Sequence, residues 1–138
     1  MNLPVVTYSN TDKNIYAFDS EKYLKRASID LIHVLNDSYI VDSSGIFYHV
    51  DKAYKTKWLY LWGYNPLKKG RTAKIDFEIE STKKISLEDF KNIITEKLDS
   101  GVGRDFWYTK KDIPRLKERV MKAETYKEVI EIFLYDED

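Results

Sequence analysis

The sequence predicts an α+β domain built from a mostly antiparallel sheet and a separate group of helices. Short runs of β-branched and aromatic residues, divided by turn-forming residues, occupy positions 1–80. Apolar residues at helical spacing occupy much of positions 86–134. Strands and helices in separate parts of a chain are typical of this class. We therefore expect roughly four to six strands, one helix near the N-terminus and about three near the C-terminus, packed on the sheet.

Length and composition indicate one domain, residues 1–138, in the reducing cytoplasm. A chain of 138 residues can bury one core without disulfides, and this one contains no cysteine. The segment Met1–Val6 lacks the basic start and apolar run of a secretory signal. No apolar stretch is long enough to cross a bilayer. We expect a cytoplasmic protein with no membrane partner.

The N-terminal region predicts a hairpin followed by a helix. The β-type runs Pro4–Tyr8 and Ile15–Phe18 flank turn-forming residues. Asp19 and Ser20 are candidate N-caps for a helix over Glu21–Leu35. The apolar residues that support this helix by their spacing are Tyr23, Leu24, Ala27, Leu31 and Leu35.

The middle of the chain predicts four strands. Tyr39–Val41 and Ile46–Val50 flank a turn in which Gly45 can take a positive φ. Trp58–Trp62 predicts a third strand with its aromatic rings on one face, and that face could be buried or exposed. Lys74–Glu80 alternates cleanly, which places Ile75, Phe77 and Ile79 toward the core and the acidic residues outward.

The last third predicts three helices. Ser86 with Asp89 resembles a capping box at the start of the first helix. Asp112 is the expected N-cap of the second, with Pro114 in its first turn, and Thr125 is that of the third. We expect these helices to cover one face of the sheet and to leave the other partly open.

No motif predicts catalysis, a metal or a cofactor. His33 and His49 belong to no HxH, HxxxH or HExxH pattern, and Asp30, one helical turn from His33, forms only a single pair of a kind that is common by chance. The sequence Gly101–Arg104 lacks the further glycine or lysine of a phosphate-binding loop, and a helix end explains it. We therefore expect a protein that is not an enzyme and that needs no cofactor.

Two acidic groups are candidate partner-binding residues. Asp76, Glu78 and Glu80 share one face of a predicted strand, and the chain ends in Asp136, Glu137 and Asp138. Such charges also serve to solvate a strand or protect its edge. Either reading leaves these acids exposed.

A basic and aromatic stretch offers an alternative binding surface. Positions 52–74 contain seven Lys or Arg residues and no Asp or Glu. Cations that alternate with flat rings suit single-stranded nucleic acid, because cations follow phosphates and rings stack on bases. The opposing interpretation is a core strand with solubilising lysines at its ends. The candidate residues are Lys55, Lys57, Trp62, Tyr64, Lys68, Lys69 and Arg71.

The C-terminal half resembles the small immunity proteins that accompany bacterial polymorphic and contact-dependent toxins. The resemblance covers roughly residues 75–134 and rests on the segments Ile85–Lys91, Asp105–Trp107 and Ala123–Ile130. It implies a non-catalytic protein that binds a toxin domain and blocks its active site or substrate path. It assigns no role to a particular residue.

Two hypotheses follow from the sequence. The first is a cytosolic protein-binding inhibitor, with toxin immunity as its specific form, which docks a basic partner on Asp76, Glu78 and Glu80. The second is a nucleic-acid-binding accessory protein of a phage or mobile element that uses positions 52–74. A net charge of zero favours the first, because nucleic-acid-binding domains are usually basic.

Overall fold

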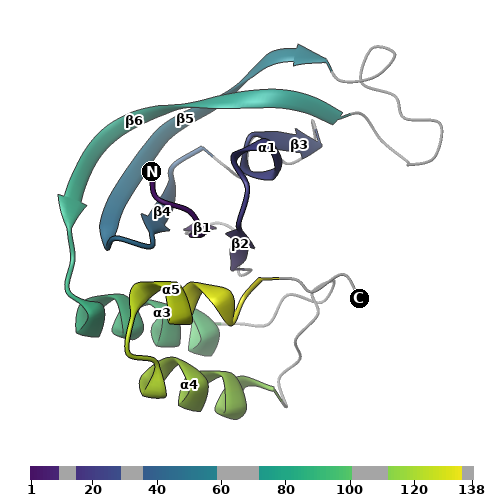
Figure 1. Cartoon of the computed structure of the whole chain (residues 1–138). Coiled ribbons are helices and arrows are strands. Elements are labelled where there is room, and N and C mark those ends of the chain that lie inside the picture. The colour runs from purple at the N-terminus through teal and green to yellow at the C-terminus, as the bar shows by residue number, and fades with distance from the viewer. Residues whose placement is uncertain (10–14, 29–35, 59–71, 101–111, 135–138) are drawn as a thin grey trace.

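A six-stranded antiparallel sheet and a C-terminal group of helices form the fold (Figure 1). The computed structural model describes residues 1–9, 15–28, 36–58, 72–100 and 112–134. The strand order across the sheet is β2-β1-β4-β5-β6-β3. In chain order the elements are β1 (Val5–Ser9), β2 (Tyr16–Phe18), α1 (Glu21–Leu24), β3 (Arg26–Ser28), β4 (Ser38–Asp42), β5 (Ile46–Trp58), β6 (Thr72–Lys84), α3 (Leu87–Ser100), α4 (Ile113–Lys122) and α5 (Tyr126–Glu131).

The long strands β5 and β6 give the sheet its curvature. Each has 13 residues, and together they arch over α1 and β3 (Figure 1). Their pairing shifts register at three places, between His49 and Val50, between Val50 and Lys52, and between Lys55 and Lys57. Such irregularities bend a strand and increase its twist. The helices α3, α4 and α5 lie on the opposite side of the sheet from α1.

Hydrophobic clusters lie on both faces of the sheet. Neighbouring residues in a strand point to opposite faces, and here they enter different clusters. Val6 and Val41, which pair in register, join the cluster that contains the apolar residues of the helices. Val5 and Ile40 join the cluster inside the curve of the sheet, together with Leu24 of α1. In the described residues, Leu24 of α1 covers part of this face.

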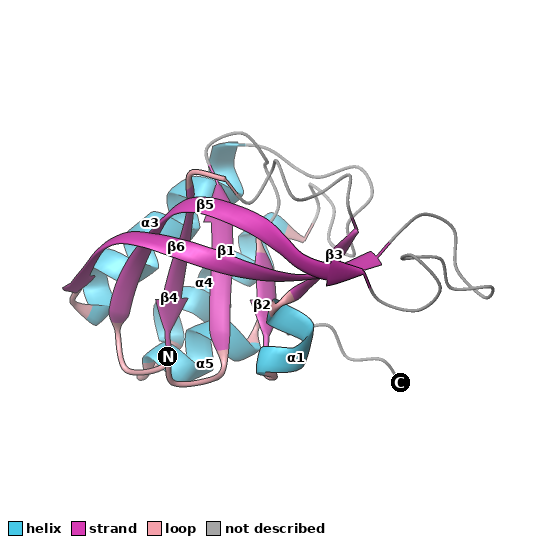
Figure 2. Cartoon of the chain, turned by 90° about the horizontal axis from the view of Figure 1, so that it is seen from above, coloured by secondary structure: helices cyan, strands magenta, loops and turns pink. Residues whose placement is uncertain are grey.

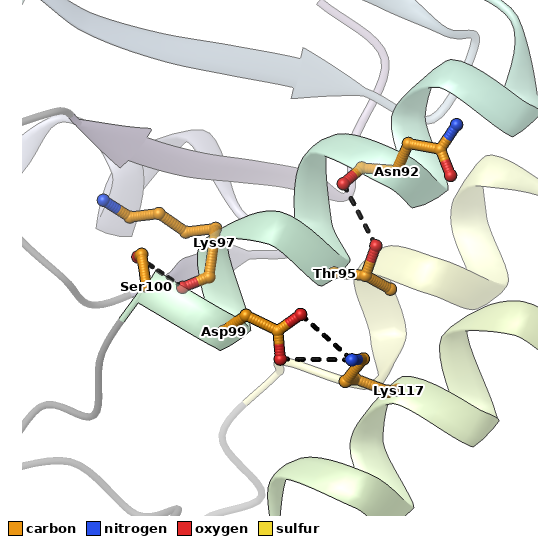
Figure 3. A network of polar contacts seen from close by, with 6 residues as sticks. All are labelled: Asn92, Thr95, Lys97, Asp99, Ser100 and Lys117. Carbon is orange, nitrogen blue, oxygen red and sulfur yellow. Dashed lines mark hydrogen bonds and ion pairs between the residues drawn. The ribbon is translucent and has the colours of Figure 1, made fainter.

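The C-terminal helices follow their sequence signals closely. Phe90, Ile94 and Leu98 form the buried stripe of α3 at intervals of one helical turn. Figure 3 shows how α3 is tied to α4, where Lys117 Nζ contacts both carboxylate oxygens of Asp99 at 3.1 and 3.0 Å. The other hydrogen bonds drawn there, from Thr95 to Asn92 and from Ser100 to Lys97, lie within α3.

Side-chain caps form at two of the three helix starts. The hydroxyl of Ser86 accepts a hydrogen bond from the backbone N–H of Asp89 at 3.0 Å. The hydroxyl of Thr125 accepts one from the N–H of Glu128 at 3.1 Å. Both predicted caps are confirmed. Asp112 makes no side-chain cap, because its backbone is already helical, with φ −82° and ψ −18°.

The turn between β4 and β5 is also an attachment point for α5. Gly45 has a φ of +84°, as predicted, and a Cβ atom there would lie 2.5 Å from Cζ of Tyr126. The hydroxyl of Tyr126 donates to the carbonyl of Ile85 at 2.6 Å, and Lys84 Nζ lies over the Tyr126 ring. Only glycine fits this turn while Tyr126 packs against it.

The helix predicted over Glu21–Leu35 is wrong after its first turn. The single turn of α1 is followed by Arg26–Ser28, which pairs with Thr72–Lys74 of β6, and residues 29–35 lie outside the described residues. The carbonyl of Lys25 already accepts a hydrogen bond from Ile75 N at 2.8 Å. Pairing with the edge of β6 therefore overrides the helical spacing of the sequence.

The predicted strands are largely confirmed. The hairpin of the first two runs is present as β1 and β2. Lys74–Glu80 lies within β6, and Ile75 is fully buried there, but Ile79 is 39% exposed rather than in the core. The pairing of β5 with β6 is irregular beside Ile79. Of the predicted strand Trp58–Trp62, Trp58 ends β5 and the rest lies outside the described residues.

Candidate functional site

A groove between the sheet and α3 brings together aromatic rings and carboxylates. We call it the tyrosine groove. Its volume is about 650 Å³. The sheet supplies Tyr8 from β1, Tyr39 from β4 and Phe47 from β5. The remaining lining residues are Lys83, Ile85, Asp89, Asn92, Ile93 and Glu96.

The floor of the tyrosine groove is a row of stacked rings. Sheet register places Tyr8 opposite Tyr39, and Tyr39 opposite His49. The ring centroids of Tyr8 and Tyr39 are 5.3 Å apart, and those of Tyr39 and His49 are 4.9 Å apart. Phe47 lies 5.2 Å from Tyr39. Cross-strand pairs of this kind fix ring positions, so the floor is preorganised.

Tyr8 stays protonated and therefore adds no charge to the floor of the tyrosine groove. Burial raises the pKa of the Tyr8 hydroxyl well above its usual range, and the neighbouring Tyr39 raises it further. A phenol with such a pKa stays protonated at any physiological pH. The floor therefore presents an uncharged aromatic surface made of stacked rings.

Carboxylates outnumber cations on the walls of the tyrosine groove. Asp89 and Glu96 come from the exposed side of α3, two turns apart. Lys83 is the one basic lining residue among those described, and its ammonium lies 5.2 Å from the centroid of Phe47. The wall next to α3 is thus acidic, while the aromatic floor lies below it. This combination favours a positively charged ligand.

His49 closes one end of the ring row and links three segments. Its Nε2 lies 2.6 Å from Oδ1 of Asp37, and its Nδ1 lies 2.7 Å from Oε2 of Glu80. The hydrogen bond to Asp37 is the main cause that raises the pKa of His49, opposed by desolvation and supported by the charges of Glu80, Asp37 and Asp51. Because a carboxylate lies beside each ring nitrogen, His49 acts as a clamp between Asp37 and Glu80.

The stabilising effect of this clamp should depend on pH. The folded-state pKa of His49 is raised, so its contribution is complete below the ordinary histidine pKa of about 6.5 and is lost as pH rises through the folded value. We expect wild type to exceed His49→Gln in free energy of unfolding by more at pH 5.5 than at pH 8.5. Urea unfolding at both pH values measures this. An equal difference at the two pH values would contradict the clamp.

The acidic residues predicted on β6 are mostly engaged. Asp76 lies 3.5 Å from Lys25 Nζ, and its Oδ1 accepts a hydrogen bond from the N–H of Phe77, which lowers the Asp76 pKa. Glu80 holds His49. Glu78 is exposed and pairs in register with Lys52. The three do share the outer face of β6, but they form no isolated acidic surface.

The other predicted site residues divide into two groups. Lys55 and Lys57 lie exposed on β5. The remainder lie outside the described residues, namely Trp62, Tyr64, Lys68, Lys69, Arg71, Asp136, Glu137 and Asp138. The acidic C-terminus and the loop part of the basic stretch therefore remain predictions.

Nothing in the sequence pointed to the tyrosine groove as a unit. Tyr8, Tyr39 and Phe47 were assigned to strands, but the order in which strands pair decides which rings meet. The pairing of β1 with β4 connects residues that are far apart in the chain. The one usable signal was the high number of tyrosines, 11 in the chain, which is typical of protein interfaces.

No described group of three or more His, Asp or Glu residues is arranged to hold a metal ion. None of the described helices is long and apolar enough to cross a membrane.

The comparisons with known proteins give no further guide. No protein-family model, no curated protein and no solved structure matches the chain.

Proposed function

We propose that this chain is a protein-binding inhibitor module that holds a basic segment of its partner in the tyrosine groove. The observation that carries this proposal is the neutral aromatic floor beneath an acidic wall. The floor is formed by Tyr8, Tyr39 and Phe47, and the wall by Asp89 and Glu96. The chain acts by occupying its partner and carries out no reaction of its own.

The physical basis is recognition of lysine or arginine by rings and carboxylates together. The aliphatic stem of a lysine or arginine can pack on the stacked rings while its charged end reaches the carboxylates of the wall. Carboxylates beside the ring add charge-assisted hydrogen bonds. Rigid aromatic anchors lose little conformational entropy on binding, so they often dominate interface energies. Acidic walls also speed association with a basic partner.

Toxin immunity is the specific form of this function that we propose. The C-terminal segments that resemble immunity proteins include α3, which supplies the acidic wall of the tyrosine groove. A toxin that acts on nucleic acid needs a basic cleft, and an inhibitor with acidic and aromatic groups complements such a cleft. Because Asp76 and Glu80 are already paired, we place the docking surface at the tyrosine groove instead of the face of β6.

Charge reversal of the acidic wall tests the proposal. We expect Asp89→Lys combined with Glu96→Lys to abolish capture of the partner in a tagged pull-down from the native host. The matched control is Glu118→Lys with Glu131→Lys, which makes the same charge change on α4 and α5. Both control residues make only exposed ion pairs, whose loss changes stability little.

Capture of the partner must survive nuclease treatment. A single stoichiometric protein that wild type and the control capture after nuclease, and that the wall variant loses, would support the proposal. Equal loss of capture in the wall variant and the control would mean that capture depends only on the net charge of the protein. Capture that disappears with nuclease would contradict a protein-binding function.

A further inference from the structure

A second charged site lies where β5 ends and β6 begins, and we call this end of the two strands the β5–β6 arm. Figure 2 shows α1 and β3 beside that end of the two long strands. A pocket of about 600 Å³ opens between the α1 segment and these ends of β5 and β6. Its charged lining consists of four lysines and two carboxylates, namely Lys22, Lys25, Lys57, Lys74, Glu21 and Asp76.

The two carboxylates neutralise only part of this positive charge. Lys25 Nζ lies 3.1 Å from Glu21 and 3.5 Å from Asp76, and the charge of Lys74 also acts on Asp76. Lys57 and Lys74 are exposed, and neither forms an ion pair with a carboxylate in the described parts of the chain. The pocket therefore retains an excess of positive charge around this pair.

Sheet register places the two lysines directly opposite one another. Lys57 of β5 pairs with Lys74 of β6, and Lys74 in turn pairs with Arg26 of β3. Like charges at directly opposed positions repel and destabilise a sheet. Two lysines at opposed positions of neighbouring strands are less destabilising where a bound anion neutralises them.

An exposed aromatic residue lies in the next row of the same face. Tyr54 pairs with Asp76, which is two residues from Lys74 and so points the same way. The Tyr54 residue is 37% exposed. Rows on one face of a sheet are close enough for a base stacked on Tyr54 to carry a phosphate toward Lys57 and Lys74.

We propose that Tyr54, Lys57 and Lys74 form a binding site for single-stranded nucleic acid. We call these residues the arm site. The lysines contact consecutive phosphates, and the tyrosine stacks on a base. A ring beside a pair of cations is the combination that non-specific single-strand binders use. A phosphorylated small molecule would need the cations but not the exposed ring. The arm site is separate from the tyrosine groove and does not depend on its function.

Fluorescence anisotropy with a labelled oligothymidylate of about 12 nucleotides tests the arm site. We expect wild-type affinity to fall as salt rises. For two phosphate contacts, the slope of log affinity against log salt should become shallower by about 1.4 in Lys57→Gln with Lys74→Gln. Tyr54→Ala should weaken binding about tenfold without changing the slope, because stacking releases no counterions.

The matched control is Lys122→Gln with Lys127→Gln, which removes two exposed lysines from α4 and α5. It should bind like wild type. Because the arm residues are exposed, their variants should fold, and thermal unfolding checks this. No binding by wild type, or equal weakening in the control, would overturn the proposal. The wall variant Asp89→Lys with Glu96→Lys should still bind the oligonucleotide, so failure of the proposed inhibitor function and failure of the arm site are distinguishable.

Discussion

Replacing Asp42 with alanine should lower the free energy of unfolding by about 3 kcal/mol, because several partly buried donors lose their charged acceptor. Asp42 ends β4 and is only 1% exposed. Its Oδ1 accepts hydrogen bonds from Ser44 N, Ser44 Oγ and Ile46 N at 3.0, 2.7 and 3.0 Å. Its Oδ2 accepts from Asn2 N at 3.2 Å and from the Tyr48 hydroxyl at 3.0 Å. One carboxylate therefore holds together the N-terminal segment, the turn and β5.

The control for Asp42 lies in the same turn. The Ser43 hydroxyl donates to the carbonyls of Asn2 and Leu3, but these groups are exposed and water can replace the donor. Ser43→Ala should therefore cost less than about 1 kcal/mol. Urea unfolding of both variants at pH 7 measures the difference. Equal stabilities of Asp42→Ala and Ser43→Ala would contradict the central role of Asp42.

The effect of Asp42 should also disappear in acid. Burial acts to raise its pKa, but the hydrogen bonds from Ser44, Ile46, Asn2 and Tyr48 outweigh this and lower the pKa. A lowered folded-state pKa gives stability that is complete above the unfolded value of about 3.9 and is lost as pH falls through the folded value. The difference between wild type and Asp42→Ala should narrow below about pH 4.

The second large effect concerns the floor of the tyrosine groove. Tyr39→Ala should weaken partner binding about 30-fold or more, as expected when the central ring of an interface is removed. Tyr39 is the middle of the row and contacts Tyr8, Phe47 and His49. Tyr39→Phe keeps the ring and should retain most of the affinity.

Calorimetric titration of the captured partner into each variant measures this effect. Circular dichroism verifies that Tyr39→Ala keeps its fold, since the side chain is half-buried. If Tyr39→Ala binds as tightly as wild type, the ring row is only a structural feature of the sheet. If Tyr39→Phe also loses binding, the hydroxyl and not the ring face is the important group.

Local signals predicted the elements that local interactions decide. The positive φ of Gly45, the Ser86 and Thr125 caps and the alternation of β6 around Ile75 all follow from neighbouring residues. The segment after Leu24 shows the opposite case. Its helical spacing is real, but an open edge of β6 is available for pairing, and only the folded sheet reveals that competitor.

The candidate sites needed pairing information that the sequence lacks. Tyr8 and Tyr39 meet because β1 pairs with β4, and Lys57 meets Lys74 because bulges shift the register of β5 against β6. Composition did indicate acidic, basic and aromatic binding groups. Composition could not show that Asp76 is paired with Lys25 and that Glu80 is paired with His49.

Photo-cross-linking from the tyrosine groove tests the central claim most directly. A photoreactive residue in place of Asn92, which lines the groove on α3, is compared with one in place of Glu118 on α4. Irradiation of the complex and mass spectrometry then identify the cross-linked peptide. We predict a cross-link from position 92 to a lysine- or arginine-rich segment of the partner, and none from position 118. Cross-links from position 118 alone, or to an acidic segment, would contradict binding in the tyrosine groove.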